Sequence, residues 1–386
     1  MRLLILGLGT AGSKIADAII RPSGHSSRCS DLHAIAVDND PQILERLSNI
    51  GEEAKFYFPK DDLEAPELLT TRFTIDEVNA KLKSFDTGIH DAILVCAGLG
   101  GSLVHLVPHL VSIIRETMFE PVFALVTIPS EEEGEGRLSK AIKHLQMVQP
   151  LVDGVILFDN QLWLDKARSE LSENILQKPA GISEKIWMPG LSEREKTEPY
   201  DLVNRHIARR IRLLVHAGEI QKGIPQTVLD SREILNTITG MSLITIGLSE
   251  EELPDHGKIG ILRQRTESRV GRQERASRIV KLAERAVFRD ISAYCDFTTA
   301  KKALILLSGP EDELSMKGYM AVRKWIDESI AGYEMRAGDI PVSSRHANRV
   351  SVLIVFSGLK TVTRVQELSE RFGERDKSGQ SSINNT

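Results

Sequence analysis

The sequence predicts an α/β protein: a Rossmann-like parallel-sheet domain, a long central helix and a smaller α+β domain. A chain of 386 residues is too long for one ordinary hydrophobic core, so two domains are expected. Apolar stretches of strand length alternate with helical patterns over roughly the first 160 residues, which is typical of βαβ units. From Met241 a new series of strands and helices begins, which indicates a separate α+β domain.

The first domain contains apolar stretches of strand length that end in glycines or acidic residues. These predicted strands are 2–6, 32–37, 91–96, 122–128 and 154–158. In a parallel sheet the carboxyl ends of the strands meet at one edge, which is where ligands of such sheets bind. Residues 165–199 are polar, contain prolines and glycines, and predict a surface insertion.

The second half begins with a long helical pattern from Leu202 to Ala217. The α+β domain is then predicted from strands at 243–246, 303–307 and 350–356 and from helices at about 268–289 and 315–330. The arginines of the first of these helices, Arg269, Arg272, Arg275 and Arg278, indicate a solvated face; contact with a partner's acidic tail is the alternative.

Composition excludes several classes of protein. Hydrophobic residues make up 41% of the chain, enough to exclude disorder of the whole chain. No apolar run is long enough to span a membrane, and a net charge of -5 gives no overall field that favours nucleic acid. Three widely separated cysteines predict neither a disulfide framework nor a zinc site. Since the chain also opens with a strand rather than a signal peptide, we expect a cytoplasmic protein.

Two glycine-rich turns follow predicted strands. Gly7, Gly9 and Gly12 have the spacing G-x-G-x-x-G, which lets backbone N–H groups approach phosphate at a helix N-terminus. The alternative is a tight turn that only packs a helix on the sheet. With Asp38 as the ribose-binding acid, this turn predicts an NAD-dependent oxidoreductase. The hypothesis of an NAD-dependent oxidoreductase gives no role to the second group of glycines, at 98–101. Two glycine turns at neighbouring strand ends instead suit the two sides of a di- or triphosphate.

Six motifs in order give the sequence a family resemblance. They are GLGTAGSKIADAI from Gly7, AIAVDNDPQIL from Ala34, AGLGGS from Ala97, T-x-P-x-x-x-E-G-x-x-R from Thr127, FDNQL from Phe158, and Y-x-x-x-N from Tyr200. The chain resembles the tubulin/FtsZ superfamily, including the archaeal tubulin-like CetZ branch. The resemblance implies a nucleotide-binding domain at 1–201, a central helix and loop at 202–240, an α+β domain at 241–360 and a largely disordered tail at 361–386.

The resemblance also implies a role for each motif residue in binding GTP or GDP. Asn160 and Asn204 would read the guanine edge, Tyr200 would stack on the base, and Glu133 and Arg137 would hold ribose and phosphate. Asp40 would help to hold Mg²⁺. The remaining nucleotide contacts would come from Gly7, Gly9, Thr10, Ala11, Gly12, Asp38, Gly98, Gly100, Gly101 and Ser102. Asp40 and Asn160 are equally typical of turns and helix caps.

The sequence departs from the family pattern where the γ-phosphate would bind. Family members continue the second glycine turn with T-G-T-G or T-G-S-G, but this chain has bulky residues from Leu103 to Leu106. The family's third loop has no counterpart in 52–66, and Arg205 replaces an acid. We therefore expect nucleotide binding with weakened γ-phosphate contacts.

Acids after the central helix imply how hydrolysis would work. In this family one subunit completes the site of the next with acids in the pattern N-x-D-x-x-D. Here Asp230 and Glu233 match it as D-x-x-E, with Val228 in place of the Asn. D-x-x-E is also a helix capping box. The resemblance thus implies head-to-tail self-association, as a filament or dimer, and slow hydrolysis. The alternative is a non-hydrolysing structural or regulatory relative.

Overall fold

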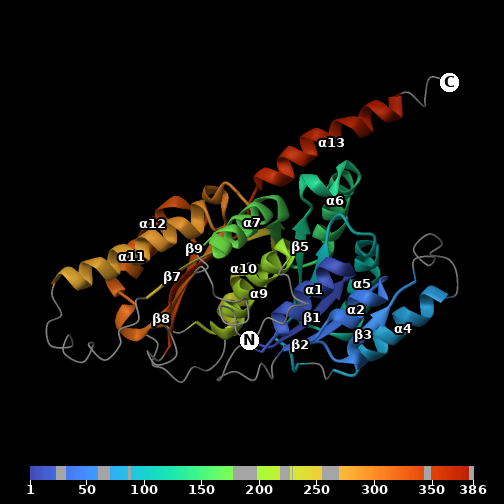
Figure 1. Ribbon diagram of the computed structural model, residues 1–386, viewed down its shortest axis with the longest axis horizontal. Helices are drawn as coiled ribbons and strands as arrows, with labels where there is room; N and C mark the ends of the chain where they lie inside the picture. The colour runs from blue at the N-terminus through green and yellow to red at the C-terminus, as the bar shows by residue number, and fades with distance from the viewer. Residues whose placement is uncertain are drawn as a thin grey trace.

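The computed structural model describes residues 1–22, 32–59, 70–85, 88–176, 198–217, 227, 229–253, 269–342 and 349–381. These residues form one ten-stranded sheet in the order β3-β2-β1-β4-β5-β6-β7-β10-β8-β9, with helices on both faces (Figure 1). The strands from β3 to β7 run parallel, and β10 lies antiparallel between β7 and β8. The predicted α/β fold class is confirmed.

The parallel half of the sheet is built from βα units. Its strands are β1 (Leu3–Leu8), β2 (Leu32–Asp38), β3 (Lys55–Tyr57), β4 (Ala92–Gly98), β5 (Val122–Ile128) and β6 (Gly154–Asp159). Its helices are α1 (Gly9–Ile20), α2 (Pro41–Arg46), α4 (Thr70–Lys83), α5 (Val107–Thr117), α6 (Glu135–Val148) and α7 (Asn160–Leu176). Every residue of β1 and β5 is buried, because helices cover both faces of a parallel sheet.

The second half continues the same sheet. It contains α9 (Pro199–Ala217), α10 (Ser231–Ile238), β7 (Met241–Glu252), α11 (Arg269–Phe288), β8 (Lys302–Pro310), α12 (Met316–Ser329), β9 (Glu334–Val342), β10 (Arg349–Ser357) and α13 (Thr363–Ser381). One hydrophobic core lies under α4, α5, α6, α11, α12 and α13, and the other lies under α1, α2, α7, α9 and α10. The described chain is therefore a three-layer α/β/α structure.

The central helix α9 joins the two halves through a buried arginine. Arg210 is 2% exposed and donates to the carbonyl oxygens of Ile246 (3.1 Å) and Asp290 (2.7 Å) in the second half. Its guanidinium carbon also lies 4.2 Å from the ring centroid of Trp163 on α7. Burial lowers the pKa of Arg210, and the carbonyl acceptors satisfy the charge that burial disfavours.

The structure differs from the expectations at two segments. The insertion expected at 165–199 is helical up to Leu176, where α7 ends, and 177–197 lie outside the described residues. The tail expected to be largely disordered, 361–386, instead contains the helix α13 (Thr363–Ser381), and 382–386 lie outside the described residues. Leu368 is 1% exposed and Phe372 is 8% exposed in the core beneath α13. Apolar side chains one turn apart give this polar segment a face to bury.

The arginine-rich helix α11 is paired within the chain. Arg275 lies 3.6 Å from Glu313, and Arg278 lies 2.5 Å from Glu313 and 2.9 Å from Glu251. Arg272 is exposed, in keeping with the expected solvated face. Contact of this face with a partner's acidic tail stays a prediction. Among the described helices, none is both long enough and apolar enough to cross a membrane.

Candidate functional site

The first glycine turn joins β1 to α1, and its glycines serve different purposes. A Cβ atom at Gly12 would overlap the carbonyl group of Cys96, and one at Gly7 would lie 2.7 Å from the oxygen of Gly12. These two glycines therefore allow α1 to pack closely on the sheet. Gly9 has φ +68°, a conformation that favours glycine. No side chain caps α1, whose first turn contains Thr10, so its N–H groups suit an anion.

The second glycine turn lies directly beside the first, because β4 pairs with β1. A Cβ atom at Gly98 would lie 3.0 Å from the Cβ of Ala11, and one at Gly100 would lie 3.0 Å from the Cβ of Arg137. Gly101 and Ser102 are exposed at the tip of the turn. The structure thus brings both predicted phosphate-binding turns to the same edge of the sheet.

Leu103 lies over the first turn. It begins a 3-10 helix, Leu103–Leu106, and is 2% exposed. Its Cβ and Cδ1 atoms lie 3.7 and 3.8 Å from the position that a Cβ at Gly9 would take. A branched side chain therefore stands against Gly9 where the family pattern has a shorter threonine. Weakened contacts with a terminal phosphate at this place stay a prediction.

Three of the predicted site residues, Arg137, Asn160 and Tyr200, converge on Glu133. The Oε1 atom of Glu133 accepts hydrogen bonds from the backbone N–H of Ser130 (3.0 Å), the hydroxyl of Tyr200 (3.1 Å) and the Nδ2 amide of Asn160 (3.3 Å). Nη1 of Arg137 lies 3.3 Å from Oε2. Carboxylate, amide, phenol and guanidinium groups from three segments of the chain thus meet beside the glycine turns.

The two asparagines and the tyrosine lie near the N-terminal ends of two helices, α7 and α9. Asn160 is the first residue of α7 and is 6% exposed. Asn204 is 9% exposed and follows Tyr200 by four residues on α9, so the two side chains share one side of that helix. Tyr200 keeps 37% of its surface exposed. The phenol ring is therefore accessible to a ligand, as stacking on a base requires.

The two acids after β2 behave differently. Asp38 is fully buried, burial raises its pKa, and its Oδ1 accepts from the N–H of Asp40 (3.0 Å). A fully buried carboxylate has no surface for a ribose, which weighs against Asp38 as a direct contact and against the NAD reading. Asp40 caps α2 by accepting from the N–H of Gln42 (3.0 Å). Among the described residues no three acids, histidines or cysteines form a metal cluster. A role of Asp40 in holding Mg²⁺ together with phosphate oxygens and water stays a prediction.

Comparisons with known proteins found similar chains and structures. A family model for the C-terminal domain of tubulin-like CetZ matches residues 194–374. Tubulin-like protein CetZ1 of Haloferax volcanii is 28% identical over 96% of this chain and 91% of its own length. The chain belongs to the tubulin/FtsZ superfamily, in its CetZ-like branch.

Solved structures have the same fold. The GDP-bound monomer of CetZ1 from Haloferax volcanii has a TM-score of 0.73 and 25% identity, covering 97% of this chain and 100% of that one. The GTPγS-bound protofilament of CetZ2 from the same organism has a TM-score of 0.73 and 23% identity over 98% of this chain and 100% of that one. Their similarity extends across both halves of the CetZ-like chain.

The candidate catalytic acids of this CetZ-like chain lie away from the glycine turns. Asp230 and Glu233 form a capping box: Asp230 Oδ1 accepts from the N–H of Glu233 (2.8 Å), and the N–H of Asp230 donates to Glu233 (3.3 Å). The helix that they cap, α10, leads to Gly240, whose N–H donates to Asp153 just before β6. Glu233 itself lies 3.9 Å from Arg336, near the start of β9, so the acids lie toward the edge where strands begin, whereas both turns lie where strands end.

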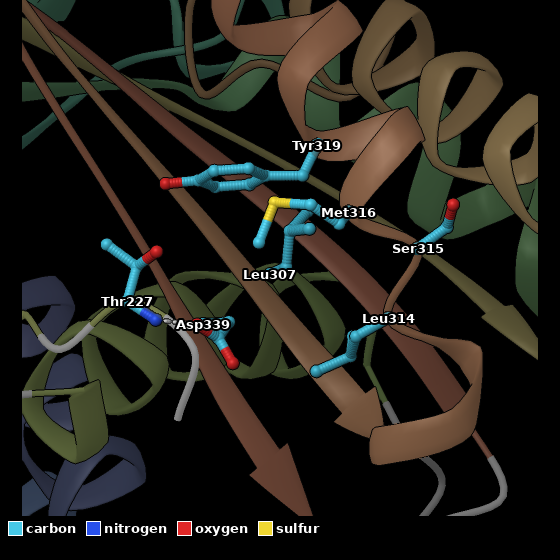
Figure 2. Close-up of a pocket in the computed structure, with 7 residues that line it drawn as sticks. All are labelled: Thr227, Leu307, Leu314, Ser315, Met316, Tyr319 and Asp339. Carbon is cyan, nitrogen blue, oxygen red and sulfur yellow. Dashed lines mark hydrogen bonds between the residues drawn. The ribbon is translucent and has the colours of Figure 1, made fainter. Parts of the chain in front are cut away.

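A small pocket near these acids is separate from the glycine turns (Figure 2). It lies between α12, β8 and β9 and has room for about one water molecule. Asp339 and Tyr319 line it with Thr227, and Asp339 Oδ1 accepts from the N–H of Thr227 (2.6 Å). This hydrogen bond holds Thr227 against β9, the last strand of the sheet. Thr227 precedes Asp230 closely in the sequence.

Two polar residues of the site were absent from the sequence prediction. Ser130 forms a capping box with Glu133, and Gln161 accepts from the N–H of Glu131 (2.9 Å) through its Oε1. The S-x-x-E spacing is a sequence signal that identifies Ser130. No comparable signal exists for Gln161, because its partner lies on another loop.

Proposed function

We propose that this protein is a cytoskeletal guanine-nucleotide-binding protein that takes GDP or GTP at the two glycine turns. The observation that carries the proposal is the convergence of Asn160, Arg137 and Tyr200 on Glu133, beside two adjacent glycine turns. The GDP-bound and GTPγS-bound states of the CetZ1 and CetZ2 structures support this choice of ligand. Asn160 and Asn204 supply amide donors and acceptors that match the guanine edge.

Nucleotide affinity tests this proposal. Purified protein is titrated with GDP, GTP, ADP and ATP by calorimetry, and we expect guanine nucleotides to bind more tightly. Asn204→Ala should cost about 1–3 kcal/mol, or roughly tenfold to a hundredfold in affinity, because polar groups of the base lose their partners. Asn236→Ala on α10 is the control, since Asn236 is an exposed helical asparagine away from the turns. Equal or tighter ATP binding would refute guanine recognition.

Head-to-tail self-association is the second part of the proposal. The glycine turns and the Asp230–Glu233 box lie at opposite edges of the sheet, so one subunit can offer its acids to the nucleotide of the next. Such a heterologous contact generates a filament unless it closes. The protofilament formed by CetZ2 of Haloferax volcanii supports this arrangement. Sedimentation with GTP, with GDP and without nucleotide tests it: material that stays monomeric in all three conditions contradicts it.

Hydrolysis by this assembly would be slow. Asp230 and Glu233 would orient water at the neighbour's terminal phosphate, with Mg²⁺ held by phosphate oxygens and Asp40. The apolar side chain of Leu103 beside Gly9 favours the second candidate, a non-hydrolysing structural or regulatory relative. A GTPase assay over a range of protein concentrations separates the two. A rate that rises with concentration supports shared sites, and no turnover at any concentration supports the non-hydrolysing protein.

A further inference from the structure

The turn that carries Glu133 holds an unusual density of negative charge. Residues 131–135 read E-E-E-G-E, so four carboxylates follow β5 within five residues. Like charges at this spacing repel one another unless cations compensate them. Glu133 itself pairs with Arg137, and Glu132 pairs with Arg168 on α7 (2.5 Å). The remaining two, Glu131 and Glu135, are compensated from the far end of the chain.

The compensating cations come from α13. Nη2 of Arg364 lies 2.7 Å from Oε1 of Glu131, and Nη1 of Arg371 lies 2.9 Å from Oε2 of the same carboxylate. Nη2 of Arg371 lies 2.9 Å from Oε1 of Glu135. These hydrogen bonds lower the pKa of Glu131, so that it stays charged. Two arginines therefore bind both oxygens of one carboxylate, and one of them bridges to a second.

The position of α13 partly shields the pair between Arg364 and Glu131 from solvent. Arg364, Leu368 and Arg371 recur at helical spacing, so they lie on one side of α13. Leu368 is 1% exposed, and α13 packs against α6, the helix that contains Arg137. Figure 1 shows α13 beside α6. The side chain of Arg364 is only 12% exposed, so water and salt screen its pair less than an open pair.

Glu131, the carboxylate that Arg364 and Arg371 bind, is connected to the candidate site by short contacts. Glu131 and Glu133 belong to the same 3-10 turn, and Ser130 N–H donates to Glu133. The N–H of Glu131 donates to Gln161, the neighbour of Asn160. The turn thus connects Glu131 to Glu133 and, through the hydrogen bonds of Glu133, to Asn160 and Tyr200.

We propose that Arg364 and Arg371 are positioning residues that clamp the turn 131–135 and thereby set the affinity for the ribose of the bound nucleotide. The inference rests on the proposed nucleotide site, in which Glu133 holds the ribose. Without the clamp, Glu131 and Glu135 repel Glu133 and the turn loses its fixed position. The loss falls on the ribose contact first, because the phosphates bind at the glycine turns on other strands.

The experiment compares two ligands that differ only at the ribose. Calorimetry on the full chain measures the affinity for GDP and for 2′,3′-dideoxy-GDP, which lacks the ribose hydroxyls. For Arg364→Gln/Arg371→Gln we expect GDP to bind about tenfold more weakly, with less than a twofold change for the dideoxy ligand. The control is Arg349→Gln, since Arg349 pairs with Glu250 and Glu252 and its side chain is 36% exposed against 38% for Arg371.

A second variant changes the acidic partner of these ion pairs instead of the two arginines. Glu131→Gln keeps both arginines and the Arg371–Glu135 pair, so it should give a smaller loss with the same selectivity, and the test survives if the double variant unfolds. Combining all three changes should add no further loss, because the same pairs are already broken. Equal weakening of both ligands, or no change, would overturn the clamp. If wild-type protein binds no guanine nucleotide at all, the proposed function itself fails, and the clamp falls with it.

Discussion

Substitution of Leu103 tests whether this residue weakens the binding of the terminal phosphate of GTP. Leu103→Thr removes the Cδ1 atom that lies 3.8 Å from the Cβ position of Gly9 and adds a hydroxyl donor. One hydrogen bond to a charged phosphate is worth about 1.5–3 kcal/mol, or roughly tenfold to a hundredfold in affinity. We expect wild-type protein to bind GTP and GDP about equally, and the variant to prefer GTP by about tenfold or more.

The same substitution has a cost in stability that the assay must separate from binding. Leu103 is 2% exposed, and truncating such a core leucine to alanine costs about 2–5 kcal/mol. Calorimetry with Mg²⁺ therefore reports the ratio of GTP to GDP affinity within each variant, which partial unfolding does not change. Leu103→Val is the matched control, because it shortens the side chain without adding a donor. A strong GTP preference already present in wild-type protein, or an unchanged ratio in Leu103→Thr, would refute the reasoning.

The other predictions concern packing, protonation and catalysis. Gly12→Ala should destabilise the fold by about 3 kcal/mol or more in urea unfolding, because its Cβ meets the backbone of Cys96; Gly136→Ala, with open space around it, should cost far less. Burial raises the pKa of Asp159 from 3.8 to about 6. The unfolded chain therefore ionises first, and stability should fall by up to about 3 kcal/mol between pH 4 and 6; Asp159→Asn should remove this slope, and an unchanged slope would contradict it. Asp230→Ala should abolish concentration-dependent GTP turnover and leave GDP affinity unchanged, apart from a cap loss of about 1 kcal/mol in stability. Retained turnover would exclude that carboxylate from the shared site.

Local features of the sequence predicted the parts of this protein that depend on neighbouring residues. A strand followed by glycines and a helix has few conformations available, so the turn at Gly9 and the one at Gly100 were predictable, as was their place at one edge of a parallel sheet. The D-x-x-E spacing likewise predicted the capping box of Asp230, which the structure contains. The bulky residue at 103 was visible as a departure from the family motif, and with it the weakened terminal-phosphate contacts that we expect.

Contacts between distant segments were decided only by the tertiary structure. Glu133 meets Tyr200 across 67 positions of sequence, and Arg371 meets Glu131 across 240. Spacing along the chain has no relation to such pairs, because the order of strands and the packing of helices bring them together. The segment after 361 shows this most clearly. Read alone it is polar and predicts a disordered tail, but α6 and the acidic turn supply an apolar surface and the opposite charges that stabilise its first turns as a helix.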